Sequence, residues 1–173
     1  FTRSKNAQTE ATITILKSNI ENFQTRWGVP PPASLRGLGT LVGYPALTDP
    51  NQDNTGIEAL VLALRSRREG GPYLDHALMA DDTRRGNLDM DTFVEAAAAP
   101  EYLDIDDATA RDLFEILDAW GNPMVYLDMA TLAAGNFQYQ VTMADGSRVV
   151  IDPTAAQNAL RHPTTGAYPQ GYV

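Results

Sequence analysis

Oxygen-bearing side chains at short spacing are the groups in this sequence with the chemistry to hold a metal ion. The stretch DPNQDNTG places them at every second position, at Asp49, Asn51, Asp53 and Thr55. The stretch DDTRRGNLDMD adds four aspartates, at Asp81, Asp82, Asp89 and Asp91. Calcium needs several such oxygens converging on one point, and the first stretch lacks the glycine and the terminal glutamate of an EF-hand loop. We therefore expect solvated acidic loops, with calcium binding as the open alternative.

Other reactive groups are few. The sequence has no cysteine, which excludes disulfides and thiolate chemistry. Its two histidines, His76 and His162, are far apart, so no zinc site is expected. The adjacent carboxylates Asp106 and Asp107 stand in a polar run, and neither a nucleophile motif nor a phosphate-binding glycine loop is present. We assign no catalytic, cofactor-binding or metal-ligating residue, and we expect a protein that is not an enzyme.

The composition describes an acidic chain with enough apolar residues for one domain with a core. It has 173 residues, a net charge of −9 and 43 % hydrophobic residues. Phosphates would be repelled by most of such a surface, which argues against nucleic acid or anionic lipid as a partner. The chain contains no apolar run long enough to cross a bilayer, and polar residues follow Arg3 and Lys5 where a secretory signal would be apolar.

The elements that must position these groups begin with a predicted helix over residues 4–27. Its large apolar residues recur in steps of three and four, at Ile13, Leu16, Ile20, Phe23 and Trp27. This spacing predicts one apolar seam, with Ile15 off the stripe. The predicted opposite face is charged, with Lys5, Glu10, Lys17, Glu21 and Arg26. Gly28 and the prolines at 30–32 end the helix. We expect the seam to dock on a sheet.

Residues 28–112 are predicted to form a helical and loop segment. Its clearest helix is NTGIEALVLALRSR, where Asn54 or Thr55 is a suitable N-cap. The apolar residues of this helix recur at helical spacing, at Ile57, Leu60, Val61 and Leu64. The alanine-rich stretch TFVEAAAA predicts a short helix that ends near Pro100. The acidic stretch from Asp81 to Asp107 enlarges this middle region.

Residues 113–173 are predicted to form a sheet region. Apolar residues alternate with polar ones at Phe137, Tyr139, Val141 and Met143, and again at Val149 and Ile151. The dipeptide Asp145-Gly146 between these runs predicts a β-hairpin. The stretch PTAAQNALRHP is open between a short helix and an irregular crossing. Because helices come first and antiparallel strands follow, the sequence predicts an α+β fold in a single domain.

The stretch DAWGNPMVYL, residues 118–127, predicts a tight turn between two strands. Gly121 permits a positive φ, and Pro123 fixes its own φ while pushing Asn122 out of the helical region. We expect the ring of Trp120 to lie over the glycine backbone and to close one end of a core. The turn offers only Asp118 as an acid or base, so we interpret it as structural.

This stretch resembles a family motif. DAWGNPMVY is similar to the Asp-Pro-Trp-Gly-Asn-Pro-x-x-Tyr motif of the major pseudopilin of bacterial type II secretion, with Ala119 in the place of proline. The matching positions are Trp120, Gly121, Asn122, Pro123 and Tyr126. Residues 5–32 resemble the periplasmic half of the family's long helix, and residues 54–74 resemble its next helix and Gly-x-Tyr-Leu turn. The three motifs stand in the family's order and cover about half of the chain.

Two features depart from the family pattern. The family's mature chain begins with an apolar transmembrane half-helix, whereas Phe1-Thr2 continues into RSKNAQTE. We expect that this chain begins at the periplasmic boundary of the helix. The family also commonly ends in a Ser-x-Gly-x-Asp-Gly loop that includes calcium ligands, and the sequence closes at Gly171-Tyr172-Val173 without that pattern.

The resemblance implies a pilin-like fold with a long N-terminal helix packed on a small antiparallel sheet. It implies a structural subunit that polymerises, in its full-length form, into a periplasmic filament anchored in the bacterial inner membrane and aiding the export of folded proteins. The implied partners are copies of itself, other pseudopilins and inner-membrane components of the secretion system. This part of the subunit alone is expected to be a soluble monomer. A type IV minor pilin or a DNA-uptake pseudopilin is the alternative.

Overall fold

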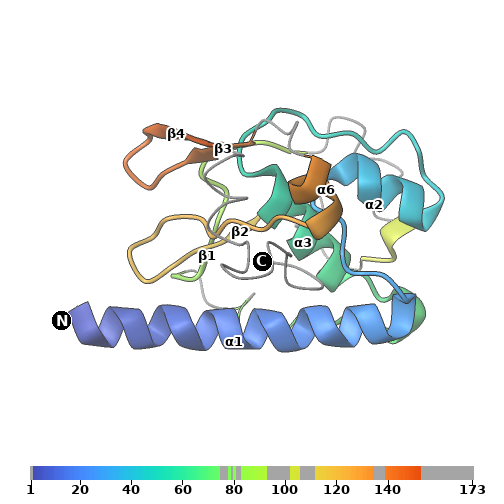
Figure 1. Cartoon of the computed structure of the whole chain (residues 1–173), viewed down its shortest axis with the longest axis horizontal. Coiled ribbons are helices and arrows are strands. Elements are labelled where there is room, and N and C mark those ends of the chain that lie inside the picture. Colours follow the sequence, from blue (N-terminus) through green and yellow to red (C-terminus); the bar gives the residue numbers. More distant parts are fainter. Residues whose placement is uncertain are drawn as a thin grey trace.

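The computed structural model describes residues 2–74, 78, 80, 83–92, 102–105, 112–134 and 139–152. Its helices are α1 (Thr2–Trp27), α2 (Leu35–Val42), α3 (Thr55–Arg65) and α6 (Met129–Ala134), with a 3₁₀ turn η1 (Arg68–Gly70). Its strands are β1 (Arg85–Gly86), β2 (Glu115–Ile116), β3 (Tyr139–Thr142) and β4 (Arg148–Ile151). The long helices precede antiparallel strands in the chain (Figure 1), so the predicted α+β class is confirmed.

The described strands form two small antiparallel sheets, not the single sheet that was predicted. Strand β1 pairs with β2, with Gly86 opposite Glu115. Strands β3 and β4 pair over four residues, from Tyr139 opposite Ile151 to Thr142 opposite Arg148. The loop before α3 adds one bridge to β3, where Asn54 N donates to the carbonyl of Gln140 at 2.9 Å. The β3–β4 hairpin is thereby attached to the start of α3.

Helix α3 is the centre of the molecule. Every residue from Gly56 to Arg65 is buried, and Figure 1 shows α3 between α1 on one side and α2 and α6 on the other, with β1 and β2 beside it. A helix that is apolar on nearly all sides is stable only inside a core. Asn54 is its N-cap residue by position, as predicted, but the Asn54 side chain makes no cap hydrogen bond. That side chain is used elsewhere, as described below.

Helix α1 lies along one side of the molecule and runs the length of it (Figure 1). Its C-terminal half docks through Leu16, Ile20 and Phe23, which are buried in the main core as predicted. Trp27 is partly buried and stacks on Phe23 with ring centroids 5.3 Å apart. The helix packs against α3 and η1, so the prediction that it docks on a sheet is wrong. A buried helix, not a pleated surface, forms its platform.

The predicted seam is wrong at its first residue, Ile13. Ile13 is 40 % exposed, whereas Thr12 is buried and Ile15 packs partly against the core. Lys5 was placed on the opposite face, but its ammonium lies 5.6 Å from the ring centroid of Trp120. N-terminal to Leu16, the face of α1 that contacts the body therefore consists of polar residues spaced about one turn apart, Thr12, Thr9 and Lys5. The positions of large apolar side chains alone do not predict this part of the contact face.

The hairpin at Asp145-Gly146 is confirmed. Gly146 has φ +80, and the backbone N of Met143 donates to the carbonyl of Ser147 at 2.8 Å. Tyr139 and Val141 are buried in a second, smaller core with Leu127 and Leu132. Val149 was predicted to share an apolar face with Ile151, but it is 44 % exposed. Within the described residues, β4 is the outer strand of its sheet and has only β3 beside it.

Several sequence predictions concern residues outside the described part of the chain. They are the two histidines, the pair at 106–107, the alanine-rich stretch, Phe137 and the segment at 153–163. Among the described residues, no helix combines the length and apolar character that crossing a bilayer would require.

Candidate functional site

Three carboxylates from distant parts of the chain meet beside the central helix. Glu58 projects from the first turn of α3, and Asp89 and Asp91 follow strand β1. Each contributes one carboxylate oxygen, and these oxygens lie within 4.8 Å of one another. We call Glu58, Asp89 and Asp91 the acidic cluster. Its two aspartates were predicted to lie in a solvated loop, which is wrong, because both are partly buried.

The loop at residues 87–91 turns both aspartates inward. Asn87 and Asp91 make reciprocal hydrogen bonds, in which the Asn87 amide donates to the Asp91 carbonyl at 2.7 Å and Asp91 N donates to Asn87 Oδ1 at 3.0 Å. Met90, between the aspartates, has φ +58 and is 84 % exposed. A left-handed residue at this position reverses the chain locally. The side chains on either side of Met90 can therefore approach the same point.

Polar neighbours hold the aspartates in place. The amide Nδ2 of Asn51 donates to Asp89 Oδ2 at 3.1 Å and to Asp91 Oδ2 at 3.0 Å. Glu115, fully buried on β2, accepts the backbone N of Leu88 through both of its carboxylate oxygens. The oxygens that remain are orphaned. Glu58 Oε1, Asp89 Oδ1 and Asp91 Oδ1 are buried and have no hydrogen-bond partner among the described residues.

The electrostatics of the acidic cluster disfavour its ionised form in the absence of a cation. Burial raises the pKa of Glu58 far above its usual range, and the charges of Asp91 and Asp89 raise it further. Burial, followed by the charge of Asp89, also raises the pKa of Asp91. The pKa of Asp89 is raised by burial as well. For Glu115, burial raises the pKa to about 7, although the hydrogen bond from Leu88 opposes the shift.

The other predicted oxygen-rich stretch does not converge on a point. Asp49 accepts the backbone N of Leu35 at 2.7 Å, at the start of α2. Asp53 is buried and pairs with Arg148 across 2.9 Å. Thr55 bonds back to the Asp53 carbonyl at 3.5 Å. Only Asn51 of this stretch reaches the acidic cluster, and it does so as a donor. The prediction of a solvated loop is wrong at Asp53, and Asp81 and Asp82 lie outside the described residues.

The predicted turn at residues 118–123 is present, but of the two strands expected around it the structure has β2 before it and only a bridge at Pro123 after it. Asp118 Oδ1 accepts the backbone N of Trp120 at 2.8 Å and of Asn122 at 2.9 Å. Gly121 has φ +85, and Pro123 bridges to Leu117 across the turn. Trp120 is 44 % exposed, so the prediction that it closes a core is wrong. Its ring instead lies beside Lys5 of α1.

Tyr126 follows the turn and ties it to the loop after α1. Its buried hydroxyl donates to the carbonyl of Pro31 at 2.5 Å. Ala119 N donates to Thr9 Oγ1 of α1 at 3.1 Å. The residues of the turn motif therefore connect α1, the proline segment and β2 through hydrogen bonds. The Asp118 carboxylate is occupied by the turn itself.

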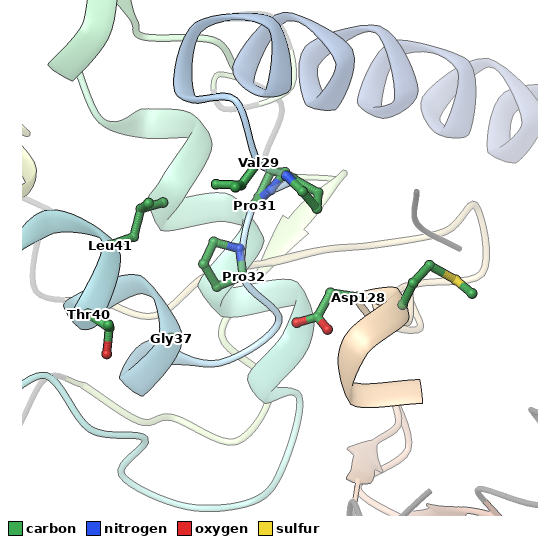
Figure 2. A pocket seen from close by; sticks show the side chains of 9 residues that line it. Val29, Pro31, Pro32, Gly37, Thr40, Leu41 and Asp128 are labelled. Atoms are coloured by element: carbon green, nitrogen blue, oxygen red, sulfur yellow. The ribbon is translucent and has the colours of Figure 1, made fainter. Parts of the chain in front are cut away.

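A hollow of about 350 Å³ opens beside the proline segment. Figure 2 shows Val29, Pro31 and Pro32 on one side, Thr40 and Leu41 of α2 on another, and Asp128 before α6. Among the described residues that line it, Asp128 is the one that carries a charge, and its Oδ2 accepts the backbone N of Ala33 at 3.0 Å. The described residues therefore bring no set of convergent acids and bases into the hollow.

The sequence carries a signal for the two buried glutamates that pattern reading missed. Glu58 stands inside GIEALVLAL and Glu115 inside LFEIL, each surrounded by apolar residues. A charged residue inside an apolar run is the informative case, because it must be paired, neutralised or bound to a metal when the run is buried.

Comparison of the chain with protein-family models, curated proteins and solved structures gives no significant match.

Proposed function

We propose that this chain is the periplasmic part of a pilin-like filament subunit, of the kind that builds the type II secretion pseudopilus. The observation that carries the proposal is the arrangement of α1. Twenty-six residues form one helix that is attached to the body along a single face. In Figure 1 the N-terminal end of α1 projects past the other described elements. A helix in this position can extend into further helix and present its outward face to neighbouring subunits.

The two faces of α1 suit two different roles, packing on the body and contact with neighbouring subunits. The inward face carries Leu16, Ile20 and Phe23 in the core. The outward face is charged and exposed, with Glu10, Lys17 and Glu21 among its residues. Subunits related by a screw operation use two different patches that need not close into a ring. Opposite charges on one exposed helix face suit such contacts, because they can fix the register between subunits.

The residues of the turn motif have a structural role that fits the proposal. The turn binds α1 at Thr9 and the loop after α1 through Tyr126. It therefore sets the angle at which the helix leaves the body. A filament subunit needs that angle to be fixed, since a small error in it accumulates from one subunit to the next. A catalytic site needs acids and bases that converge on one point. The turn offers only Asp118, so a structural role accounts for it better.

A charge-reversal experiment tests the proposal. The gene is expressed with whatever sequence precedes Phe1, in cells that carry the export system, and the assembled fraction is measured by shearing and sedimentation. We expect Glu10→Lys to lower the assembled fraction about tenfold, equivalent to roughly 1.4 kcal/mol per contact. The melting temperature of the soluble chain should stay within about 2 °C, because the residue is exposed.

The control variant is Val150→Lys, which adds a charge at an exposed position of β4, away from α1. It should leave assembly unchanged. The proposal fails if Glu10→Lys unfolds the chain as much as it reduces assembly, or if no polymer forms in any background. The codons upstream of Phe1 and the neighbouring genes then choose between a secretion pseudopilin and the alternatives, a type IV minor pilin or a DNA-uptake pseudopilin.

A further inference from the structure

We propose that Glu58, Asp89 and Asp91 bind one calcium ion that fastens the loop after β1 to the central helix. The proposal concerns a site separate from the filament contacts of α1. Its ligands are carboxylate oxygens, which are the donors that hard divalent cations prefer. The three residues converge although one comes from α3 and two from residues 83–92.

The state of Glu58 points to a bound cation independently of the cluster's composition. The residue is 1 % exposed, and its Oε1 has no hydrogen-bond partner in the part of the chain that the structure describes. One of its carboxylate oxygens lies within 4.8 Å of one oxygen of Asp89 and of one oxygen of Asp91. A buried carboxylate oxygen that accepts no hydrogen bond is costly unless a proton or a metal completes it. Asp89 Oδ1 and Asp91 Oδ1 are orphaned as well.

The size of the cluster fits calcium. Calcium–oxygen bonds are about 2.3–2.6 Å long, so two oxygens on opposite sides of one ion are about 4.6–5.2 Å apart. The three carboxylate oxygens lie within 4.8 Å of one another, and one calcium ion can contact them all. Magnesium, with bonds of about 2.0–2.1 Å, requires a tighter and more regular arrangement. Calcium also accepts irregular geometry and completes its shell with water or carbonyl oxygens.

The surrounding contacts leave the required oxygens available. Asn51 donates to Oδ2 of both Asp89 and Asp91, which leaves each Oδ1 to the ion. Glu115 uses its oxygens to hold the backbone N of Leu88 and the amide of Asn54. It positions the loop without entering the cluster. Three carboxylates give a charge of −3 when ionised, and a dication leaves a net charge of −1.

Calcium-dependent stability of the 173-residue chain tests the assignment. The chain is purified in chelator, dialysed, and titrated with calcium chloride while binding heat and melting temperature are measured. We expect one calcium per chain. At free calcium of about 100 times the Kd, the unfolding equilibrium constant should fall about 100-fold. For a chain of this size that is a rise in melting temperature of about 5–10 °C. Magnesium at the same concentration should have a smaller effect.

Matched variants connect the response to the cluster. Glu58→Gln keeps the size of the side chain and removes its charge, so it should abolish the calcium response while raising the melting temperature of the calcium-free chain. Asp91→Asn should weaken calcium binding at least tenfold, and it serves as the second variant if Glu58→Gln does not fold. The control is Glu10→Gln, the same substitution at an exposed residue of α1, which should bind calcium as the unchanged chain does.

Three results would overturn the assignment. One is the absence of binding heat and of any shift in melting temperature at millimolar calcium. Another is a calcium response that survives in both Glu58→Gln and Asp91→Asn. The last is an equal response to magnesium, which would show a less selective cation site. None of these results bears on filament assembly, which the charge reversal at Glu10 tests separately.

Discussion

The side-chain amide of Asn54 donates to Oε1 of Glu115 across 2.8 Å, between residues 61 positions apart. The same side chain accepts the backbone N of Thr142 through its Oδ1, at 3.1 Å. Asn54 therefore joins the start of α3 to β2 and to β3. Its φ of +53 places the backbone in the left-handed region, which asparagine tolerates better than most residues. One buried amide thus holds three elements together.

Replacing Asn54 with alanine should destabilise the chain strongly. The change leaves Glu115 Oε1 without this donor and the backbone N of Thr142 without its acceptor, both in buried surroundings. We expect a loss of about 2–4 kcal/mol in the free energy of unfolding, measured by urea denaturation. Asn54→Gly separates the causes, because glycine accepts the positive φ but makes neither bond. If Asn54→Gly is as stable as the unchanged chain, the hydrogen bonds are not what matters.

The stability of the calcium-free chain should fall as pH rises from 4.5 to about 7. Burial raises the pKa of Glu115 in the folded state from 4.5 to about 7. Between these values the folded chain holds a proton that the unfolded chain has released, so a higher pH favours unfolding. The cost is absent below the lower pKa and complete above the higher one. It amounts to at most about 3 kcal/mol.

The measurement for this prediction is the urea midpoint in chelator across that pH range. Glu115→Gln is the matched variant, because glutamine cannot ionise. Its midpoint should depend less steeply on pH than that of the unchanged chain. Glu58, Asp89 and Asp91 also have raised pKa values, so a residual slope of the same sign should remain. If Glu115→Gln leaves the pH dependence of the urea midpoint unchanged, a group other than Glu115 is responsible for it.

Gly56→Ala should prevent stable folding. A Cβ at this position would lie 2.0 Å from the carbonyl oxygen of Tyr126, which is backbone and cannot move aside. The first turn of α3 packs so closely on the segment after the turn that only glycine fits. We expect a loss of more than about 3 kcal/mol, observed as a lost or greatly lowered melting transition.

The control for this substitution is Gly146→Ala in the β3–β4 hairpin. Gly146 has φ +80, and a Cβ there would meet nothing within 4 Å. The cost should be the conformational one alone, about 1 kcal/mol. If both variants lose the same free energy of unfolding, the backbone at Tyr126 can move to accommodate the added Cβ, and the prediction for Gly56 is wrong.

Tyr126→Phe should cost about 1–2 kcal/mol in the free energy of unfolding. The substitution keeps the ring and removes the hydroxyl that donates to the carbonyl of Pro31. Thermal denaturation of the variant measures the loss. Tyr102→Phe is the comparison, since Tyr102 is partly exposed and stacks on Tyr44 with ring centroids 4.4 Å apart. That variant should stay within about 0.5 kcal/mol of the unchanged chain.

Local signals predicted the local structure well. The helix over 4–27 is found at Thr2–Trp27, and the turns at Gly121 and Asp145-Gly146 are where their residues require them. Each of these features depends on residues a few positions apart, whose backbone preferences act without the rest of the chain. The seam of α1 was predicted correctly at Leu16, Ile20 and Phe23 and wrongly at Ile13.

Long-range contacts explain what was missed. Nothing near Glu58 in the sequence indicates that Asp89 and Asp91 lie beside it, because a loop and a strand pair bring them there. Lys5 was assigned to the polar face since its partner, Trp120, is distant in the chain. The burial of α3 on all sides could have been inferred from its composition, and with it the importance of a glutamate inside an apolar run.

The central place of α3 has a consequence for biosynthesis. A ribosome releases this apolar helix before it has made Glu115, Tyr139 and Thr142, which enclose the start of the helix or bond to the residue before it. At about 5–20 residues per second, roughly 4–15 s pass between the two events. The nascent chain must keep α3 from aggregating during that interval, so a chaperone that holds unfolded chains has time to bind. The interior can then form only after translation has passed the β3 strand.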